Sequence, residues 1–222
     1  LDRSTVQGVS EALNAVPGIA TSETYLGSGT NIAIRGVGAS FPLFTGPSAV
    51  AYYLDSVPFG LVKSAIGPDA GAYDLERVEV LRGPQGTLYG SSALNGVVRI
   101  LTADPDLTQF SAKARVSGSG TQGGGSNYRA NVMFNAPIIE DRLGARATIG
   151  YQRDSGWIDR PNASDVNDSN IATYRLKLEG RPSDDLTIGL FAWRHRSDAD
   201  APNLGYTFDR SSSLLDQPTS TD

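Results

Sequence analysis

Four segments in the second half of the chain alternate polar and apolar side chains, and turn-forming residues separate them. In residues 128–136, tyrosine, alanine, valine and phenylalanine alternate with arginine, asparagine and methionine. The same alternation occupies residues 112–117, 143–152 and 172–179, and a fifth, more mixed segment covers residues 186–194. A period of two places successive side chains on opposite faces of a β-strand. The pattern therefore predicts consecutive antiparallel strands, each with one polar and one apolar face.

The connections between these segments alternate in length. Residues 137–142 and 181–185 are short turns, whereas residues 118–127 and 154–170 are longer, polar and rich in glycine, asparagine or aspartate. Short turns at one rim and long loops at the other are typical of a transmembrane β-barrel. An up-and-down sheet in a soluble β domain would produce the same strand pattern, so both interpretations remain open at this point.

Two features favour the membrane. The polar face carries cations that suit a water-filled lumen, at Lys113, Arg115, Arg129, Arg146, Arg175 and Lys177. Aromatic residues near the strand ends suit an interfacial girdle, at Tyr128, Tyr151, Trp157, Tyr174 and Trp193. Five strands cannot close such a barrel, and an open edge in lipid leaves backbone groups unpaired. We therefore expect further strands to follow, and the polar stretch Thr219–Asp222 is typical of the middle of an extracellular loop.

The first half of the chain has a different organisation, with a boundary at residues 103–109. A short helix is predicted over Ser10–Val16, because good helix formers there are followed by Pro17 and Gly18. Strands are predicted at residues 30–35, 49–54, 77–82 and 97–101. Residues 1–106 are thus expected to form an α+β domain built on one small mixed sheet, and residues 107–222 the strand-rich domain.

Composition excludes several kinds of site. The chain has no cysteine and one histidine, His195, which excludes disulfides and thiolate metal sites and makes zinc or triad chemistry a poor fit. The net charge of −5 comes with no basic run that would indicate nucleic acid. No apolar stretch approaches the ~20 residues of a membrane helix. Residues 83–92 resemble a phosphate loop but lack its lysine, so no enzyme is predicted.

One long motif points to a known family. It runs from Asp74 to Gly90 as DLERVEVLRGPQGTLYG and continues over Ala93–Ile100 as ALNGVVRI. Residues 34–38 and 50–58 precede it in the order that the family uses, as does the helix that ends at residues 16–19. Together these segments span residues 9–102, and they strongly resemble the plug domain of TonB-dependent outer-membrane receptors. The sequence Leu-Asn-Gly at residues 94–96 departs from the small residues of many members.

The resemblance implies a 22-stranded barrel whose lumen holds the plug, in the outer membrane of a Gram-negative bacterium. It implies active uptake of a scarce nutrient, most often a ferric siderophore or similar iron complex, and in some members cobalamin, haem or a carbohydrate. TonB and its inner-membrane complex supply energy through a box N-terminal to the plug. No such box precedes Val6, so the chain is expected to begin after it. The partners implied are TonB, the nutrient and membrane lipid, with no cofactor and no bound metal. The alternative is a soluble secreted or periplasmic β-rich binding module.

Three groups of residues are candidates for function. Charged side chains expected to project from the plug and seat it in a polar lumen are Arg35, Arg77, Glu79 and Arg82, the last three from one sheet face. Glycines of the plug motif, expected to allow tight turns and close approach to the barrel wall, are Gly36, Gly83, Gly86, Gly90 and Gly96. Candidates for substrate contact on outward loops are Phe41, Leu43, Phe44, Thr45, Lys63 and Tyr73, with Ile66 and Asp69 near them.

The charged group and the substrate-contact group also have a simpler interpretation. Arg77 and Glu79 would form an ordinary surface pair worth less than about 1 kcal/mol. Phe41 and Phe44 would pack against the barrel rather than meet a ligand.

Overall fold

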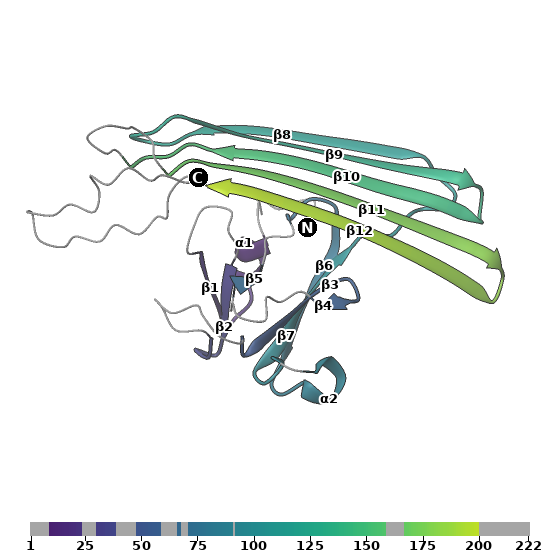
Figure 1. Ribbon diagram of the computed structural model, residues 1–222, viewed down its shortest axis with the longest axis horizontal. Helices are drawn as coiled ribbons and strands as arrows, with labels where there is room; N and C mark the ends of the chain where they lie inside the picture. Colours follow the sequence, from purple (N-terminus) through teal and green to yellow (C-terminus); the bar gives the residue numbers. More distant parts are fainter. Residues whose placement is uncertain are drawn as a thin grey trace, which may run out of the picture. The chain divides into compact units, whose positions relative to one another are not determined.

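The computed structural model describes residues 9–23, 30–38, 48–58, 66–67, 71–90, 92–158 and 167–199 (Figure 1). These residues form two compact units, one that ends at Pro105 and one that begins at Asp106. The first unit combines short helices with short strands, and the second consists of five long strands. In the described part of the chain, no helix is long and apolar enough to cross a bilayer.

The N-terminal part of the first unit is a helix beside a small antiparallel sheet. Helix α1 (Val9–Asn14) is followed by a sheet of order β1-β2-β5, with β1 at Ile19–Glu23, β2 at Thr30–Ile34 and β5 at Ile66–Gly67. The helix buries Val9 and Leu13, one turn apart on one face. The predicted helix is confirmed, although it ends at Asn14, before the Pro17–Gly18 turn.

The second sheet of this unit has the order β4-β3-β7-β6. Its strands are β3 (Val50–Leu54), β4 (Val57–Pro58), β6 (Leu75–Arg82) and β7 (Gly96–Thr102), and only the β3–β7 pair is parallel. Strands β3 and β7 are mostly apolar, apart from Arg99 and Thr102 of β7, and are mostly buried, as expected for central strands. The four predicted strands are present, but they belong to two sheets rather than one, because β2 pairs with β1 and β5 instead of β3.

A four-residue helix, α2 (Gly86–Tyr89), lies within the glycine-rich motif. The Tyr53 hydroxyl donates to the Tyr89 carbonyl at 2.9 Å, and the two rings meet edge to face at 5.2 Å. Ala51, Ala93 and Val97 form the buried cluster beneath this contact. Packing on β3 therefore fixes a helix too short to be stable alone.

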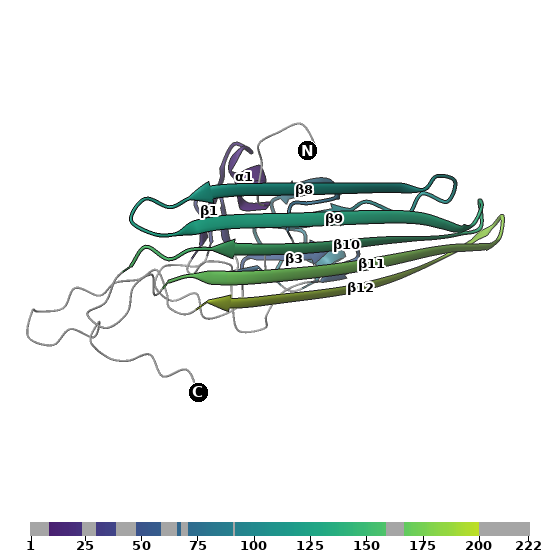
Figure 2. The same ribbon diagram turned by 90° about the horizontal axis from the view of Figure 1, so that it is seen from above.

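The second unit is one antiparallel sheet in which the strands follow sequence order (Figure 2). Its strands are β8 (Ser111–Gly120), β9 (Ser126–Ile139), β10 (Leu143–Asp154), β11 (Ser169–Ser183) and β12 (Leu186–Ala199). All five predicted strands are confirmed, and each is longer than its alternating core. The expected loop at residues 118–127 is shorter than predicted, because polar residues at the ends of β8 and β9 continue the backbone ladder.

The register assigns every side chain of this sheet to a face. One row across the five strands reads Ala112, Phe134, Ala147, Leu176, Ala192, and the next row, on the other face, reads Lys113, Met133, Thr148, Arg175, Trp193. The predicted cations therefore share the polar face. Trp193 also lies there, stacked on His195 with ring centroids 5.8 Å apart, which corrects its assignment to the aromatic girdle.

Burial on the two faces is inverted relative to a soluble sheet. Met133 and Arg175 on the polar face are buried, at 1% and 7% exposed. The large side chains of the apolar face are exposed, at Val116, Tyr128, Phe134, Ile149, Tyr151, Tyr174, Leu176, Ile188 and Leu190. An apolar, exposed outer face over five strands is the arrangement of a barrel wall in lipid.

Candidate functional site

Charged residues on β6 and β7 form a compact ion cluster. The Arg77 Nε donates to Glu79 Oε1 at 2.7 Å, and Arg99 Nη1 donates to Glu79 Oε2 at 2.7 Å, while Arg77 also pairs with Glu76. The pair Glu79–Arg99 is directly cross-strand. The hydrogen bond from Arg77, followed by the charge of Arg99, lowers the pKa of the Glu79 carboxyl. The same bond raises the pKa of the Arg77 guanidinium.

Arg82 does not belong to this cluster. Arg82 lies an odd number of residues after Arg77 and Glu79, so its side chain is on the opposite face of β6. The expectation that all three project from one face is therefore wrong. The Arg82 Nη2 donates instead to the Pro17 carbonyl at 2.6 Å. The backbone N–H of Arg35 donates to the adjacent Gly18 carbonyl at 2.7 Å. Two of the four predicted seating residues thus hold the turn that follows α1.

Asn95 also connects separate segments of the first unit, and this role is not predicted from the sequence. Its Nδ2 donates to the Ile34 carbonyl at 2.8 Å and to the Val37 carbonyl at 3.0 Å. The buried Tyr52 hydroxyl donates to the Thr30 carbonyl at 3.3 Å. These bonds connect the two sheets of the unit, since Asn95 and Tyr52 belong to the four-stranded sheet region and their acceptors lie in or beside β2.

The motif glycines have different local roles. Gly36, Gly83 and Gly90 have positive φ angles, whereas Gly86 does not. Gly96 is the position where a side chain would collide, because an added Cβ would lie 2.5 Å from the Leu81 carbonyl oxygen and 2.7 Å from Ile34 Cδ1. The close approach at Gly96 is therefore to neighbouring strands of its own unit.

The second unit begins with a set of hydrogen bonds, here called the Asn135 clasp, that the alternating pattern did not predict. The wholly buried Asn135 accepts a hydrogen bond from the Asp106 N–H at 2.8 Å, and it donates to the carbonyls of Asp106 and Gln109 at 2.9 and 2.7 Å. The Asp106 carboxylate accepts from the Thr108 N–H and hydroxyl, which lowers its pKa. The Asp141 N–H donates to the Leu107 carbonyl at 3.0 Å. Residues 106–109 are thus fixed to β9 and its turn.

Two asparagines organise the opposite end of the strands. Asn127 Oδ1 accepts from the N–H and hydroxyl of Ser155, at 2.7 and 2.9 Å. The wholly buried Asn167 accepts from the N–H groups of Trp157 and Ile158, at 2.8 and 2.9 Å. Side-chain amides therefore satisfy backbone donors where the ladder ends, which gives the adjoining loops a fixed base.

Comparison with known proteins identifies the family. Residues 1–97 match the family model described as the TonB-dependent receptor plug domain. The chain belongs to the TonB-dependent receptor family. The pesticin receptor of Yersinia pestis is 31% identical over 157 residues, which cover 70% of this chain and 22% of that protein. The iron-regulated outer membrane virulence protein of Vibrio cholerae is 31% identical over 146 residues, 63% of this chain and 22% of its own length.

The fold of the whole chain agrees with this membership. The crystal structure of the ferric yersiniabactin uptake receptor FyuA from Yersinia pestis superposes with a TM-score of 0.74 at 27% identity, covering 90% of this chain and 31% of that one. The chain thus spans about a fifth of the length of the curated relatives and a third of the structural one. Its fold is that of the plug and barrel strands of Gram-negative outer-membrane receptors.

In this TonB-dependent receptor, the predicted substrate-contact residues are only partly placed. Phe41, Leu43, Phe44, Thr45 and Lys63 lie outside the described residues, as does Asp69. Tyr73 is half-buried directly before β6, and Ile66 begins β5. Among the described residues, no group of three or more metal-ligating side chains lies together.

Proposed function

We propose that the chain supplies the plug and the first barrel strands of a transporter that takes up a ferric siderophore or similar iron complex. The plug motif carries this proposal, because it identifies a receptor family whose relatives here include a ferric yersiniabactin uptake receptor and an iron-regulated outer-membrane protein. The exposed apolar face of β8–β12 supports it from physics, since lipid would cover a face of that extent without the cost of exposing it to water.

The proposed energy source is TonB, pulling on a segment N-terminal to the plug. Among the described residues, a pull transmitted through α1 would reach the Pro17–Gly18 turn next. Arg82 and Arg35 hold that turn through two hydrogen bonds, and Asn95 holds the end of β2 through two more. Polar contacts of this kind can break and re-form in water without exposing a large apolar face. The N-terminal sheet is therefore the part of the plug that we expect to move first.

We further propose that Arg35, Arg77, Glu79 and Arg82 seat the plug in the barrel lumen. Arg77 and Glu79 are part of an ion cluster that remains partly exposed, with 51% and 30% of their side chains accessible, so each retains hydrogen-bonding capacity. The polar strand face supplies cations and buried polar groups that suit a wet lumen. Phe41, Leu43, Phe44, Thr45, Lys63 and Tyr73 are proposed to meet the substrate on the outward side.

Uptake in a deletion strain tests the proposal. A strain that lacks the full-length gene would be supplied with radioactive iron bound to a panel of siderophores and to citrate, with labelled cobalamin as the comparison. We expect the loss of uptake of one siderophore, restored by the gene and abolished when tonB is also deleted. If the deletion leaves the uptake of every iron complex unchanged, the proposed substrate class is wrong. If the gene restores uptake in a strain without TonB, the proposed energy source is wrong.

A further inference from the structure

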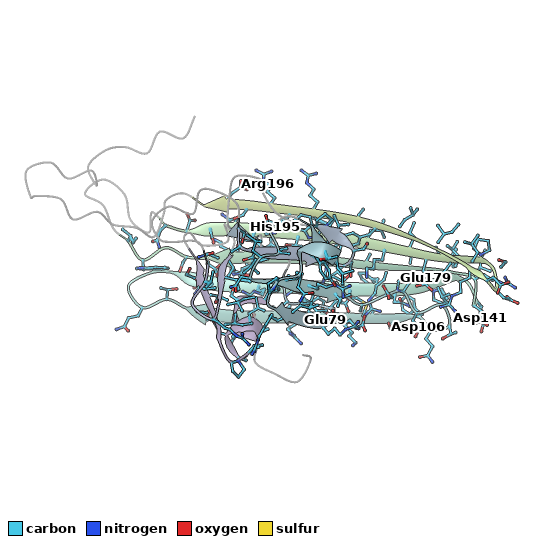
Figure 3. All side chains as sticks on the ribbon, turned by 90° about the horizontal axis from the view of Figure 1, so that it is seen from below. Glu79, Asp106, Asp141, Glu179, His195 and Arg196 are labelled. Carbon is cyan, nitrogen blue, oxygen red and sulfur yellow. The ribbon has the colours of Figure 1, made fainter. Side chains whose placement is uncertain are left out.

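Three arginines stand near one end of the mostly apolar face of the five-stranded sheet, where Asn170 and Asp198 share that face with them. Arg194 lies opposite Tyr174, Arg196 lies opposite Ala172, and Arg153 lies opposite both Asn170 and Tyr128. They therefore share a face with Phe134, Ile149 and Leu176, not with the lysines and arginines of the polar face. Figure 3 labels Arg196 towards one end of the strands, and Asp141 and Glu179 at the other.

Tyrosines accompany these arginines. The Tyr128 and Tyr151 rings lie 6.0 Å apart, Arg153 is hydrogen-bonded to Tyr128, and the Tyr151 hydroxyl donates to Asn170 at 3.0 Å. We call Tyr128, Tyr151, Arg153, Tyr174, Arg194 and Arg196 the arginine–tyrosine patch. Arg196 also donates through Nε to Asp198 at 2.8 Å, and Arg153 lies 3.9 Å from Asp168. Each guanidinium has five donors, so contact with one carboxylate does not exhaust it.

The patch reaches the depth expected of lipid headgroups. Its outer row contains Tyr128 and Arg153, and Arg196 and Arg194 lie two and four residues further into the apolar face. On β9, Tyr128 and Ile138 are ten residues apart, which at about 3.4 Å per residue and a tilt of about 40° corresponds to a height of roughly 26 Å. The apolar band of an outer-membrane barrel is about 25 Å tall. Tyr128 therefore marks one boundary of the band, and Ile138 and Ile139, both exposed, mark the other.

The loop lengths indicate which leaflet the patch faces. The connection between β10 and β11 at the patch end spans residues 155–168, whereas the turns at the other end span residues 140–142 and 184–185. Longer loops lie outside the cell in such barrels. The patch is therefore at the level of the outer-leaflet headgroups.

We propose that the arginine–tyrosine patch binds the phosphate groups of an outer-leaflet lipid. A guanidinium offers a planar fork that matches phosphate, and long cationic side chains on a lipid-facing surface extend towards the interface. The patch is continuous with the exposed apolar face, so its ligand must bring acyl chains together with an anion. That combination is a phosphorylated lipid rather than a free anion or a soluble protein.

Native mass spectrometry of the full-length receptor tests this site. Purified lipid A with two phosphates would be titrated into the detergent-solubilised receptor, and dephosphorylated lipid A would serve as the comparison. The variant Arg153→Gln/Arg194→Gln/Arg196→Gln should bind the phosphorylated lipid at least about tenfold more weakly, since three charge-assisted contacts are removed. The dephosphorylated lipid should bind wild type and variant alike. The matched control is Arg142→Gln/Arg181→Gln, which removes two half-exposed arginines at the other end of the strands and should bind as wild type does.

Equal binding of the phosphorylated lipid to wild type and triple variant would overturn the proposal. So would displacement of the lipid by excess inorganic phosphate, which would indicate a free-anion site. If the triple variant does not reach the membrane, the single variant Arg196→Gln decides in its place. Its side chain is 67% exposed, so folding does not depend on it, and it should lower lipid binding measurably.

Discussion

The side-chain amide of Asn135 pairs with the peptide of Asp106 as a neighbouring strand would, accepting its N–H at 2.8 Å and donating to its carbonyl at 2.9 Å. The partners are 29 residues apart in sequence, and Asn135 is wholly buried. A single side chain thus fixes the segment that enters the strand-rich unit.

Loss of this clasp should loosen residues 106–109. In Asn135→Leu, three hydrogen bonds disappear while the branching of the side chain at Cγ is kept. Because Asp106 and Gln109 are exposed and water can replace part of the loss, we expect a cost of about 1–2 kcal/mol. Hydrogen exchange of the Asp106 amide in the full-length receptor should accelerate. Gln109→Ala is the control, since only the backbone carbonyl of Gln109 takes part, and exchange that is equally slow in Asn135→Leu would refute the clasp.

Gly96 should not tolerate even a methyl group. An added Cβ would lie 2.5 Å from the Leu81 carbonyl oxygen, and backbone cannot yield as a flexible side chain does. Gly96→Ala should therefore destabilise the plug by about 1–3 kcal/mol. Gly86→Ala is the matched substitution, because no atom lies within 4 Å of its added Cβ, and it should be neutral. Hydrogen exchange across β6 and β7 measures both, and equal protection in the two variants would contradict the account.

Protonation of Glu79 at acidic pH should lower the stability of the plug. Its pKa is lowered in the folded state by Arg77 and then Arg99, so the ionised carboxylate stabilises the fold above the ordinary value of 4.5. This contribution is lost as the pH falls from 4.5 through the lowered pKa. Glu79→Gln should flatten the acid limb of a thermal-unfolding profile, and Arg77→Gln should reduce its slope. An acid limb that is identical in wild type and Glu79→Gln would rule out this linkage.

Transport should respond to the two charged contacts of β6. Arg82→Ala removes the bond to Pro17, and Glu79→Ala removes the centre of the ion cluster. Both residues are exposed or half-exposed, so folding should change little while the plug is held less firmly. We expect either greater entry of large antibiotics or weaker siderophore uptake. Arg181→Ala serves as the control, and unchanged leak and unchanged uptake in both variants would remove these residues from plug seating.

Much of the strand-rich unit follows from its sequence, because period-two alternation and turn residues act locally. The register confirms the polar face of Arg115, Arg146 and Arg175 and the exposed positions of Tyr128 and Tyr151. Trp193 was assigned to the wrong face because β12 is less regularly patterned.

The first unit was less predictable, because tertiary contacts decide it. Strand β1 has the sequence IATSE, whose strand character depends on pairing with β2. Helix α2 exists through packing of Tyr89 on Tyr53. The hydrogen bonds made by the side chains of Asn135 and Asn95 were not predicted for a similar reason. Each is one asparagine whose partners lie 26 or more residues away, and no local pattern distinguishes it from an exposed asparagine.

Cysteine scanning of β9 tests the central claim that this sheet is a barrel wall with lipid outside it. These 222 residues contain no cysteine, so a single cysteine introduced here reports alone once any cysteine elsewhere in the full-length receptor is replaced. Spin labels at Val132 and Phe134, in the full-length receptor within membranes, should collide readily with oxygen dissolved in lipid. Labels at Asn131 and Met133 should not. Alternation with a period of two would support the account, whereas labels at Val132 and Phe134 that collide mainly with a water-soluble reagent would contradict it.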